Sequence, residues 1–425
     1  MSHPPESRDA PADWFGHPRG LTILFLTEMW EKFSYFGMRT LLVYYMTKAL
    51  LMPQAQASWI YGLYTAFAYF TPIIGGAIAD RYMGRRRAVI VGGSIMALGH
   101  FMMTFESLFY PALATIAIGN GLFLPSLPSQ VQALYRPRDP RANSAYNVYY
   151  VGINLGAVLA AIVCGALGEL YGWHFGFGAA GIGMCLGLVI YVVGGRYLPA
   201  EVAVAAPVEA PDRSNESWRA RIGLLIGVIA IVVIFRGAYE QIGNTVALWA
   251  DTGIDRHVGA DRTIPATWFQ ALNPLLVFTL TPILLAIWKR RAGRPFSPLR
   301  RMAVGAAIVA AAYVLLAFSA GAEPAHWLWL ATFLLVYTLG ELFILPTGLG
   351  LFGRLPPRNL AATSIALWFS ASFAGNLLAG LLGAFWSELA PRAFFLMIAA
   401  VAATSAALLL LTERWARRLL HDGLG

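Results

Sequence analysis

Charged side chains lie inside several otherwise apolar stretches of this sequence, and their spacing defines the chemistry available to them. Between residues 21 and 46, polar side chains follow the first at offsets of three, four, seven and eleven positions. These residues are Glu28, Glu31, Lys32, Tyr35 and Arg39. At about 100° per residue of an α-helix, all five fall on one narrow stripe. A polar stripe on an apolar helix faces a water-filled cavity, where it can exchange protons and bind a charged solute.

Two later apolar stretches contribute further charges. Arg236 and Glu240 lie four positions apart, so a helix places them on one face, where they can form an ion pair. Glu341 has no Lys or Arg within its own stretch. A charge at the bilayer centre costs at least ~2.5 to 3.5 kcal/mol, and we therefore interpret these groups as functional. An open alternative is that the charges form static ion pairs that only hold the helices together.

The stretches that position these residues are long enough to cross a membrane. Hydrophobic residues make up 58% of the 425-residue chain and charged residues only 12%, about half the charged fraction of an average soluble protein. A crossing needs about 20 mostly apolar residues, because each backbone amide in hydrocarbon must be satisfied within its own helix. We therefore predict an all-α membrane protein with twelve transmembrane helices. Their ranges are 21–46, 57–79, 88–106, 110–133, 144–167, 174–197, 220–250, 266–290, 302–321, 326–351, 361–387 and 393–412.

The predicted helices divide into two halves. We predict a tail at 1–20, an N-terminal six-helix bundle at 21–198, a linker at 199–219, a C-terminal six-helix bundle at 220–412 and a tail at 413–425. Short motifs recur between the halves at nearly constant offsets: Thr71-Pro72 and Thr281-Pro282, Pro125 and Pro346, Asn154 and Asn376. Corresponding breaks are typical of transporters whose binding site lies between two repeated bundles, although such prolines could instead kink helices for packing.

The net charge of +9 comes from Lys and Arg residues that cluster in alternate loops, while the opposite loops hold several acidic residues. By the positive-inside rule, we expect both termini on the cytoplasmic side of a bacterial inner membrane. The positive charge is thus a topology signal, and we expect no nucleic acid partner. No apolar segment precedes the first helix, so we expect no cleavable signal peptide. Cys164 and Cys185 lack metal-ligand spacing, and we interpret them as packing residues.

A loop rich in glycine and arginine, residues 76–87, joins the second and third predicted helices. It lacks the Gly-Lys-Ser/Thr end of a phosphate-binding loop. We predict that Asp80 and Arg85 in this loop latch the half that moves. The alternative is that its basic residues only set the topology.

Taken together, the motifs resemble the proton-dependent oligopeptide transporter family of the major facilitator superfamily, over nearly the whole chain. Residues 28–37, EMWEKFSYFG, are similar to the family's helix 1 signature, and residues 76–87 are similar to the superfamily's helix 2 to 3 loop. Further matches are Gly152 to Gly156, Tyr239 to Gln241, Trp268 to Pro274, Gly340 to Phe343 and Trp368 with Phe369. The resemblance implies the major facilitator fold.

The resemblance also implies roles for individual residues. Proton coupling would fall to Glu28, Glu31, Lys32 and Glu240, and gating to the pair Arg39 and Glu240. The substrate site would contain Arg39, Tyr35, Tyr69, Asn154, Asn273, Glu341 and Trp368. In this scheme Glu341 receives the amino terminus of a peptide, the two asparagines its backbone, and Arg39 its carboxylate.

Four positions depart from the family pattern. Lys32 replaces an arginine, which keeps the charge but loses the bidentate fork. Phe36 lacks the hydroxyl of a family tyrosine. Leu124 occupies the place of a helix 4 lysine that would contact the substrate carboxylate and pair with Glu341. Arg236 stands where the family usually has an aromatic residue, and we predict that it supplies a substitute positive charge in the substrate site.

Our leading hypothesis is a proton-coupled symporter of peptides or peptide-like solutes that works by alternating access. We expect a monomer in the lipid bilayer, with the proton as coupling ion and with no cofactor or metal. A proton-linked exporter of drugs or metabolites and a non-transporting sensor remain alternatives. An intramembrane enzyme is disfavoured, because the carboxylates are spread over three predicted helices with no Ser/His pair or HExxH motif.

Overall fold

The computed structural model describes residues 13–14, 16–135, 139, 141–199, 217–259, 262–290, 296–321, 323–354 and 361–423. The predicted N-terminal tail is therefore described only in part, and residues 200–216 of the predicted linker lie outside the described residues.

Twelve long helices in the part of the chain that the structure describes, six in each half, overlap the twelve predicted ranges and confirm the predicted fold class. The first half contains α1 (Arg19–Tyr44), α2 (Gln54–Ile78), α3 (Arg85–Met102), α4 (Phe109–Ser126), α6 (Arg141–Ala166) and α7 (Trp173–Val193). The second half contains α8 (Ser217–Tyr239), α10 (Phe269–Arg290), α11 (Pro298–Ser319), α12 (Trp327–Arg354), α13 (Ala361–Ala384) and α14 (Pro391–Gly423).

Short elements extend or connect these helices. They are the α-helices α5 (Pro128–Ala133) and α9 (Thr245–Thr252), the π-helical turns η1 (Tyr45–Ala49), η2 (Ala79–Met83) and η4 (Leu167–Tyr171), and the 3-10 turns η3 (Glu106–Leu108), η5 (Gly194–Tyr197), η6 (Glu240–Gly243), η7 (Ala266–Trp268) and η9 (Phe385–Ser387). Two antiparallel strand pairs join β1 (Asp13–Trp14) to β2 (His17–Pro18) and β4 (His257–Val258) to β5 (Arg262–Thr263). A parallel pair joins β3 (Ile254–Asp255) to β6 (Ala325–His326).

Ten helical segments of the described chain are long and apolar enough to cross a membrane by composition alone. The two long helices outside that set are α1 and α3. α1 carries the charged stripe identified above, and the 18-residue α3 begins with three arginines. Their charge content, rather than their length, therefore separates them from the other ten.

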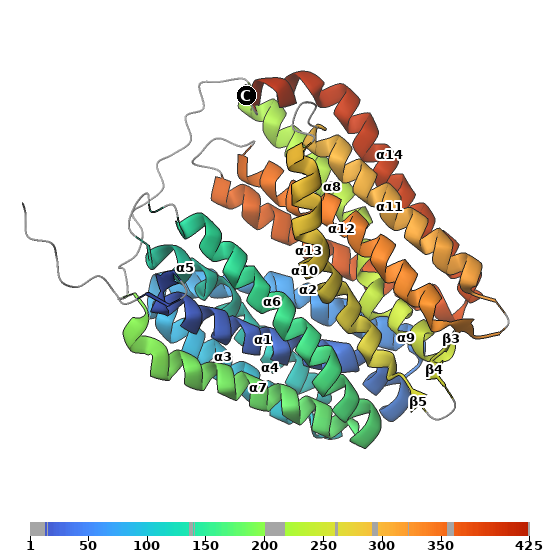
Figure 1. Ribbon diagram of the computed structural model, residues 1–425, viewed down its shortest axis with the longest axis horizontal. Coiled ribbons are helices and arrows are strands. Elements are labelled where there is room, and N and C mark those ends of the chain that lie inside the picture. The colour runs from blue at the N-terminus through green and yellow to red at the C-terminus, as the bar shows by residue number, and fades with distance from the viewer. Residues whose placement is uncertain are drawn as a thin grey trace, which may run out of the picture.

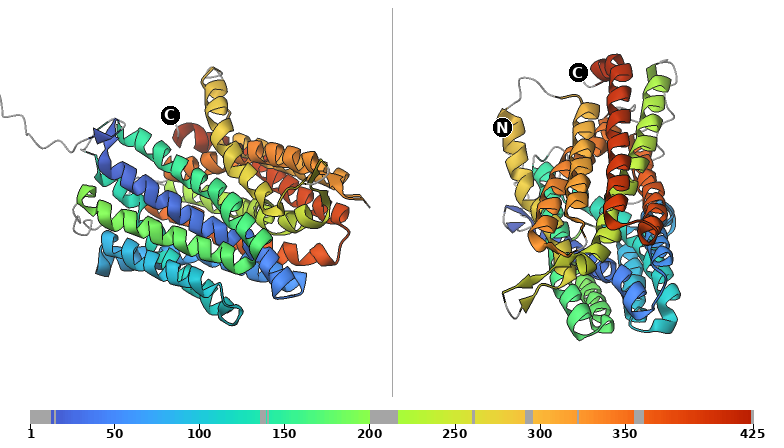
Figure 2. Two further views of the ribbon diagram at one scale, coloured as in Figure 1. Left: turned by 60° about the horizontal axis from the view of Figure 1, so that its bottom comes forward. Right: turned by 90° about the vertical axis from the view of Figure 1, so that its right-hand side faces the viewer.

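The two halves have equivalent helix packing (Figure 1). α1 packs against α6 and α7, as α8 packs against α13 and α14; α3 packs against α4 and α7, as α11 packs against α12 and α14. The halves meet through two equivalent pairs, α2 with α13 and α6 with α10. α1 begins and α14 ends at one end of the bundle, the termini side, and the short strands β3, β4 and β5 lie at the opposite end, the far side (Figures 1 and 2).

Close glycine contacts support the same repeat. A Cβ atom on Gly92 of α3 would lie 2.7 Å from the carbonyl oxygen of Gly119 on α4. In the second half, a Cβ atom on Gly305 of α11 would lie 2.6 Å from the carbonyl oxygen of Gly340 on α12. Small residues let transmembrane helices approach closely, so both halves use the same packing device at the same helix pair.

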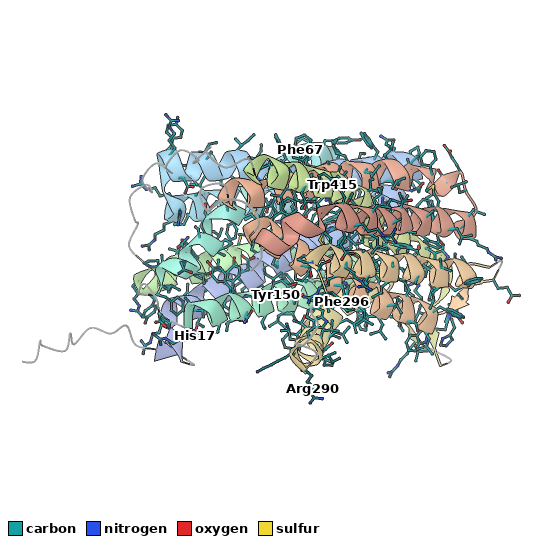
Figure 3. All side chains as sticks on the ribbon, turned by 90° about the horizontal axis from the view of Figure 1, so that it is seen from above. His17, Phe67, Tyr150, Arg290, Phe296 and Trp415 are labelled. Carbon is teal, nitrogen blue, oxygen red and sulfur yellow. The ribbon has the colours of Figure 1, made fainter. Side chains whose placement is uncertain are left out.

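Large apolar side chains cover the outer surface of the bundle. Phe67 is 40% exposed and Trp415 is 72% exposed. Seen from above, Phe67 and Arg290 lie at opposite edges of the molecule (Figure 3). An apolar exterior of this kind is compatible with lipid, whereas the charged stripe of α1 is buried inside.

Candidate functional site

Glu240 lies at the interface between the halves and binds two arginines. α8 ends at Tyr239, and Glu240 begins the turn η6. Glu240 Oε2 accepts a hydrogen bond from Nη2 of Arg39 on α1 at 2.7 Å, and its Oε1 accepts one from Nη1 of Arg236 on α8 at 2.8 Å. Tyr61 of α2 also accepts a hydrogen bond from Nε of Arg39 at 2.7 Å. One carboxylate is thus shared by two guanidinium groups, which leaves one net positive charge at this end of the site.

Glu341 of α12 is held by neutral donors. Its Oε1 accepts a hydrogen bond from the Tyr239 hydroxyl at 2.9 Å, and its Oε2 accepts one from the Asn273 amide at 2.7 Å. Among the described residues, Glu341 forms no ion pair within 4.0 Å. Leu124, at the family's lysine position, lies on α4 and lines neither of the two cavities described next. This end of the site therefore carries a negative charge without a cation.

Two adjoining cavities contain most of the predicted substrate residues. The first has a volume of about 210 Å³, and the predicted residues that line it are Arg39, Tyr69, Asn154, Arg236, Glu240, Asn273 and Glu341. The second has a volume of about 370 Å³ and is mostly apolar, with Trp288 and the predicted Trp368 in its wall. Tyr150 and Leu345 line both cavities. The second cavity leads along α10 toward Lys289 and Arg290, which lie on the termini side.

The remaining predicted residues of α1 form a separate cluster. The Lys32 ammonium lies 2.6 Å from Oε2 of Glu31 and 3.4 Å from Oε1 of Glu28. Tyr149 of α6 donates a hydrogen bond to Glu28. These side chains line neither cavity. Tyr35 is buried with its ring 5.9 Å from the Lys32 ammonium and also lies outside both cavities, so its part in substrate binding stays a prediction.

A second set of charges joins the halves on the far side, and the sequence analysis did not identify it. Lys48 lies 2.6 Å from Asp251, whose other oxygen lies 3.1 Å from Arg256. Arg256 also lies 3.0 Å from Glu169 of η4, in the opposite half. Glu169 accepts hydrogen bonds from the backbone amides at the N-terminus of η7, a position that favours a carboxylate. We call these four residues the far-side network.

The predicted loop latch contains one direct contact. Arg85 Nε lies 3.4 Å from Asp80 Oδ1, and Nη1 of Arg85 donates a hydrogen bond to the Ser129 carbonyl at 3.4 Å. All three residues belong to the first half, and the ion pair is largely exposed. Exposed pairs contribute about 0 to 1 kcal/mol, so this contact alone holds the loop weakly. A gating role for Asp80 and Arg85 stays a prediction.

Sequence reasoning did not single out Tyr239 as a partner of Glu341, nor Tyr150 as a residue common to both cavities. Tyr239 precedes Glu240 directly, and Tyr150 lies four residues before Asn154 on the same helix face. The second spacing was a usable signal, because it aligns an aromatic ring with a predicted substrate residue. The first was not, since the contact between Tyr239 and Glu341 joins two helices far apart in sequence.

Comparisons with known proteins place the sequence and the fold. Residues 24–379 match the family model described as Major Facilitator Superfamily. The peptide transporter YePEPT of Yersinia enterocolitica is 30% identical over 87% of this chain and 88% of its own length. A crystal structure of the peptide transporter POT in complex with sulfate has a TM-score of 0.90 at 28% identity, and a mutant of that transporter in complex with alafosfalin has a TM-score of 0.88 at 28% identity. In both cases 98% of each chain is covered.

Proposed function

This chain belongs to the proton-dependent oligopeptide transporter family of the major facilitator superfamily, and we propose that it carries peptides or peptide-like solutes across the bacterial inner membrane together with protons. The observation that supports this most strongly is the charge distribution of the first cavity. Arg39 and Arg236 share one carboxylate at one end, and at the other Glu341 has no cation within 4.0 Å among the described residues. A zwitterion with an ammonium group at one end and a carboxylate at the other complements both.

The peptide-like class of solute is supported by the relatives. The Yersinia relative is named as a peptide transporter, and a solved relative holds alafosfalin. In the proposed binding mode, the ammonium group of the solute meets Glu341 and its carboxylate meets Arg236 and Arg39. Asn154 and Asn273 line the wall between them and can hydrogen-bond an amide backbone. Trp368 and Trp288 of the second cavity offer apolar surface to a side chain.

The proposed orientation places both termini in the cytoplasm, following the basic loops on that side. The ion pair between Arg39 and Glu240 joins the two halves at the site, and the far-side network joins them between the site and the far side. The second cavity extends from the site toward the termini side. The arrangement corresponds to an inward-facing state of an alternating-access cycle. For the outward-facing state, the contacts on the far side must break and the halves must close on the termini side.

The proposed proton sites are the carboxylates of the α1 cluster and Glu240. Glu28 and Glu31 face a single ammonium group, so one proton gained or lost changes the charge balance of the cluster. Each proton that enters the cell down the membrane potential provides ~2.3 kcal/mol per 100 mV. We propose a monomer as the transporting unit.

The experiment is uptake into proteoliposomes with an imposed pH gradient. We expect radiolabelled dipeptide to accumulate when the proton gradient is directed inward and to equilibrate when a protonophore collapses it. No accumulation of any member of a dipeptide and tripeptide pool, with the gradient verified by a dye, would contradict the proposal. Extrusion of solute under the same gradient would instead select an exporter.

A further inference from the structure

The helix that carries the Glu240 site is interrupted without a proline. α8 ends at Tyr239, the 3-10 turn η6 follows, and α9 begins at Thr245. The sequence has no proline between residues 217 and 252, although proline is a usual cause of a sharp break. A break inside a bilayer frees backbone carbonyls that hydrocarbon cannot hydrogen-bond, so protein groups must satisfy them.

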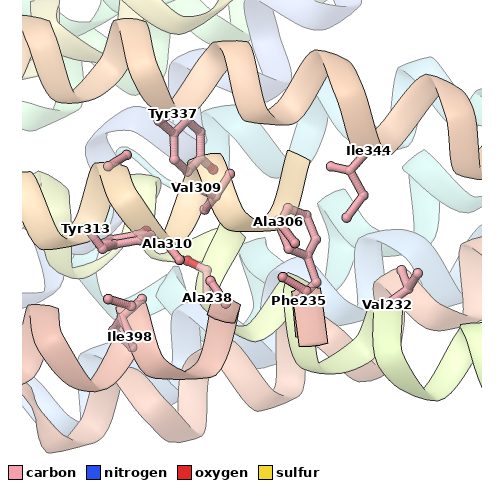
Figure 4. Packing of buried hydrophobic residues seen from close by; sticks show 14 of the residues in the cluster. Val232, Phe235, Ala238, Ala306, Val309, Ala310, Tyr313, Tyr337, Ile344 and Ile398 are labelled. Atoms are coloured by element: carbon pink, nitrogen blue, oxygen red, sulfur yellow. Dashed lines mark hydrogen bonds between the residues drawn. The ribbon is translucent and has the colours of Figure 1, made fainter. Parts of the chain in front are cut away.

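Side chains satisfy three consecutive carbonyls before the break. The Tyr313 hydroxyl of α11 donates to the Ala238 carbonyl at 2.8 Å, and the Tyr337 hydroxyl of α12 donates to the Tyr239 carbonyl at 2.6 Å. The Gln241 amide donates to the Gly237 carbonyl at 3.1 Å. Figure 4 shows the Tyr313 hydroxyl directed toward Ala238 inside the core of the second half.

The two hydroxyl donors are fixed in place by aromatic packing. Tyr313 and Tyr337 are fully buried, and their rings meet edge to face at 6.3 Å. The Tyr337 ring also stacks on the Tyr239 ring, with centroids 5.3 Å apart and planes inclined by 16°. Tyr239 in turn donates to Glu341 and lies 5.7 Å from the Arg236 guanidinium. The tyrosines therefore connect the break to both charged ends of the cavity.

An unbroken α-helix would use these carbonyls differently. The amide of Ile242 would bind the Ala238 carbonyl, and the amide of Gly243 would bind the Tyr239 carbonyl. In the 3-10 turn η6 each amide instead bonds the carbonyl three residues back, and the tyrosine hydroxyls donate to the Ala238 and Tyr239 carbonyls from the side. Glu240 is the first residue of this tighter turn, and the non-helical residue of the break is Asn244, with φ −114° and ψ −96°. The turn geometry that the hydroxyls stabilise therefore also sets where the Glu240 carboxylate points.

We infer that Tyr313 and Tyr337 are positioning residues whose hydroxyl groups keep the chain after Tyr239 in the tighter 3-10 turn and so hold the Glu240 carboxylate between Arg39 and Arg236. The inference rests on the proposed function, because it assigns the break a part in coupling. Neither tyrosine lines a described cavity. Their effect on transport must therefore pass through the backbone of the break and not through contact with the solute.

The test compares Tyr313→Phe, Tyr337→Phe and the double variant with wild type. Phenylalanine keeps the ring packing and removes only the hydroxyl donor. Tyr191→Phe is the matched control, because the buried Tyr191 hydroxyl donates to Gln130 within the first half, away from α8. Uptake of a dipeptide is measured in proteoliposomes as a function of pH, and hydrogen–deuterium exchange is measured over residues 240–243 in the same preparations.

We expect each single variant to raise the apparent KM about fivefold, as expected for the loss of one buried hydrogen bond. The pH of half-maximal uptake should shift in both, because Glu240 is held less closely between its arginines. Amide exchange at Ile242 and Gly243 should slow as the α-helical bonds form. Tyr191→Phe should leave all three readouts unchanged. In a Glu240→Gln background, Tyr337→Phe should have no further effect on the pH profile.

Two results would overturn the inference: a pH profile that superimposes on wild type in the double variant, or exchange over 240–243 that does not change. A lower maximal rate with an unchanged pH profile would indicate that the hydroxyls only stabilise the fold. The exchange measurement separates this inference from the proposed function. If exchange is slower in the variants but wild type transports no peptide, the transport proposal is refuted. The conclusion that the two hydroxyls maintain the turn after Tyr239 would still hold.

Discussion

The two buried charge clusters of this protein contain the same types of residue and differ in what surrounds them. In the α1 cluster, Lys32 lies within 3.4 Å of both Glu28 and Glu31, and none of the three lines either of the two described cavities. In the cavity cluster, the two arginines share Glu240, and Glu341 binds only neutral donors. We call the α1 cluster the closed cluster, because its charges pair with one another and can exchange little more than a proton. We call the cavity cluster the open cluster. It leaves opposite charges at the two ends of a cavity, where the charged groups of a solute can pair with them.

The largest effect should come from the closed cluster. Glu31→Gln keeps the size of the side chain and removes a proton-binding group 2.6 Å from Lys32. We expect uptake driven by a pH gradient to fall to background, while exchange of labelled for unlabelled solute across the membrane continues. The measurement is gradient-driven uptake and counterflow in the same proteoliposomes. Glu106→Gln, at an exposed residue of η3, is the control. Gradient-driven uptake that survives in Glu31→Gln would remove the distinction between the clusters.

In the open cluster, Glu341→Gln should weaken binding of a free peptide. A hydrogen bond to a charged group contributes about 1.5 to 3 kcal/mol, so we expect Kd to rise by about tenfold to a hundredfold. The measurement is binding of a dipeptide and of the same dipeptide with an acetylated amino group. Acetylation removes the ammonium group, so the substitution should not weaken the acetylated ligand further. An equal loss for both ligands would show that Glu341 does not receive the amino group.

At the other end of the cavity, Arg236→Met should have a smaller effect. Among the described residues Arg39 is then left as the ion-pair partner of Glu240, so the net positive charge at this end is lost, but one guanidinium group still faces the cavity and can contact the carboxylate of the solute. We expect Kd for a dipeptide to rise about fivefold to tenfold, with little change for the same dipeptide carrying a C-terminal amide. Equal effects on both ligands would mean that Arg236 only anchors Glu240, and the sequence interpretation of this arginine as a substitute cation would be wrong.

Spacing along one helix predicted contacts in both clusters, including the pair Arg236 and Glu240. The water-filled cavity predicted beside the α1 stripe lies next to Arg39, whereas the rest of the charged stripe lines neither described cavity. The helical stripe places Glu28, Glu31 and Lys32 together through spacing alone, because all three lie on one helix. The apolar runs likewise predicted twelve helices and their division into halves. The open cluster depends on contacts between helices, such as Asn273 with Glu341, that local spacing cannot encode. The sequence analysis predicted a continuous helix over 220–250, which is wrong: the helix is interrupted at Asn244, where the dipeptide Gly243-Asn244 and not a proline was the local signal.

The far-side network resembles the closed cluster in that its charges pair with one another, but its ion pairs are partly exposed to water and should therefore contribute less. Glu169→Gln removes one ion pair with Arg256 and weakens the hydrogen bonds to the N-terminus of η7. We expect a shift of about 1 kcal/mol toward the outward-facing state, or roughly fivefold in its population. Spin labels on the far side, read by distance measurement, would report it. An unchanged distance distribution would mean that the network does not restrain opening.

His100 is a buried titratable residue of α3 that belongs to neither charge cluster, so it shows whether burial alone gives such a residue a part in transport. Both ring nitrogens of His100 lack a hydrogen-bond partner among the described residues. An unsatisfied buried polar group costs about 1 to 3 kcal/mol, whereas a leucine of similar size satisfies the same packing. We therefore expect His100→Leu to raise Tm in detergent and to leave uptake unchanged, with the exposed His174→Leu as control. A lower Tm together with an altered pH profile of uptake would instead mean that the imidazole takes part in proton transfer. In that case a buried titratable group outside both charge clusters would also contribute to proton coupling.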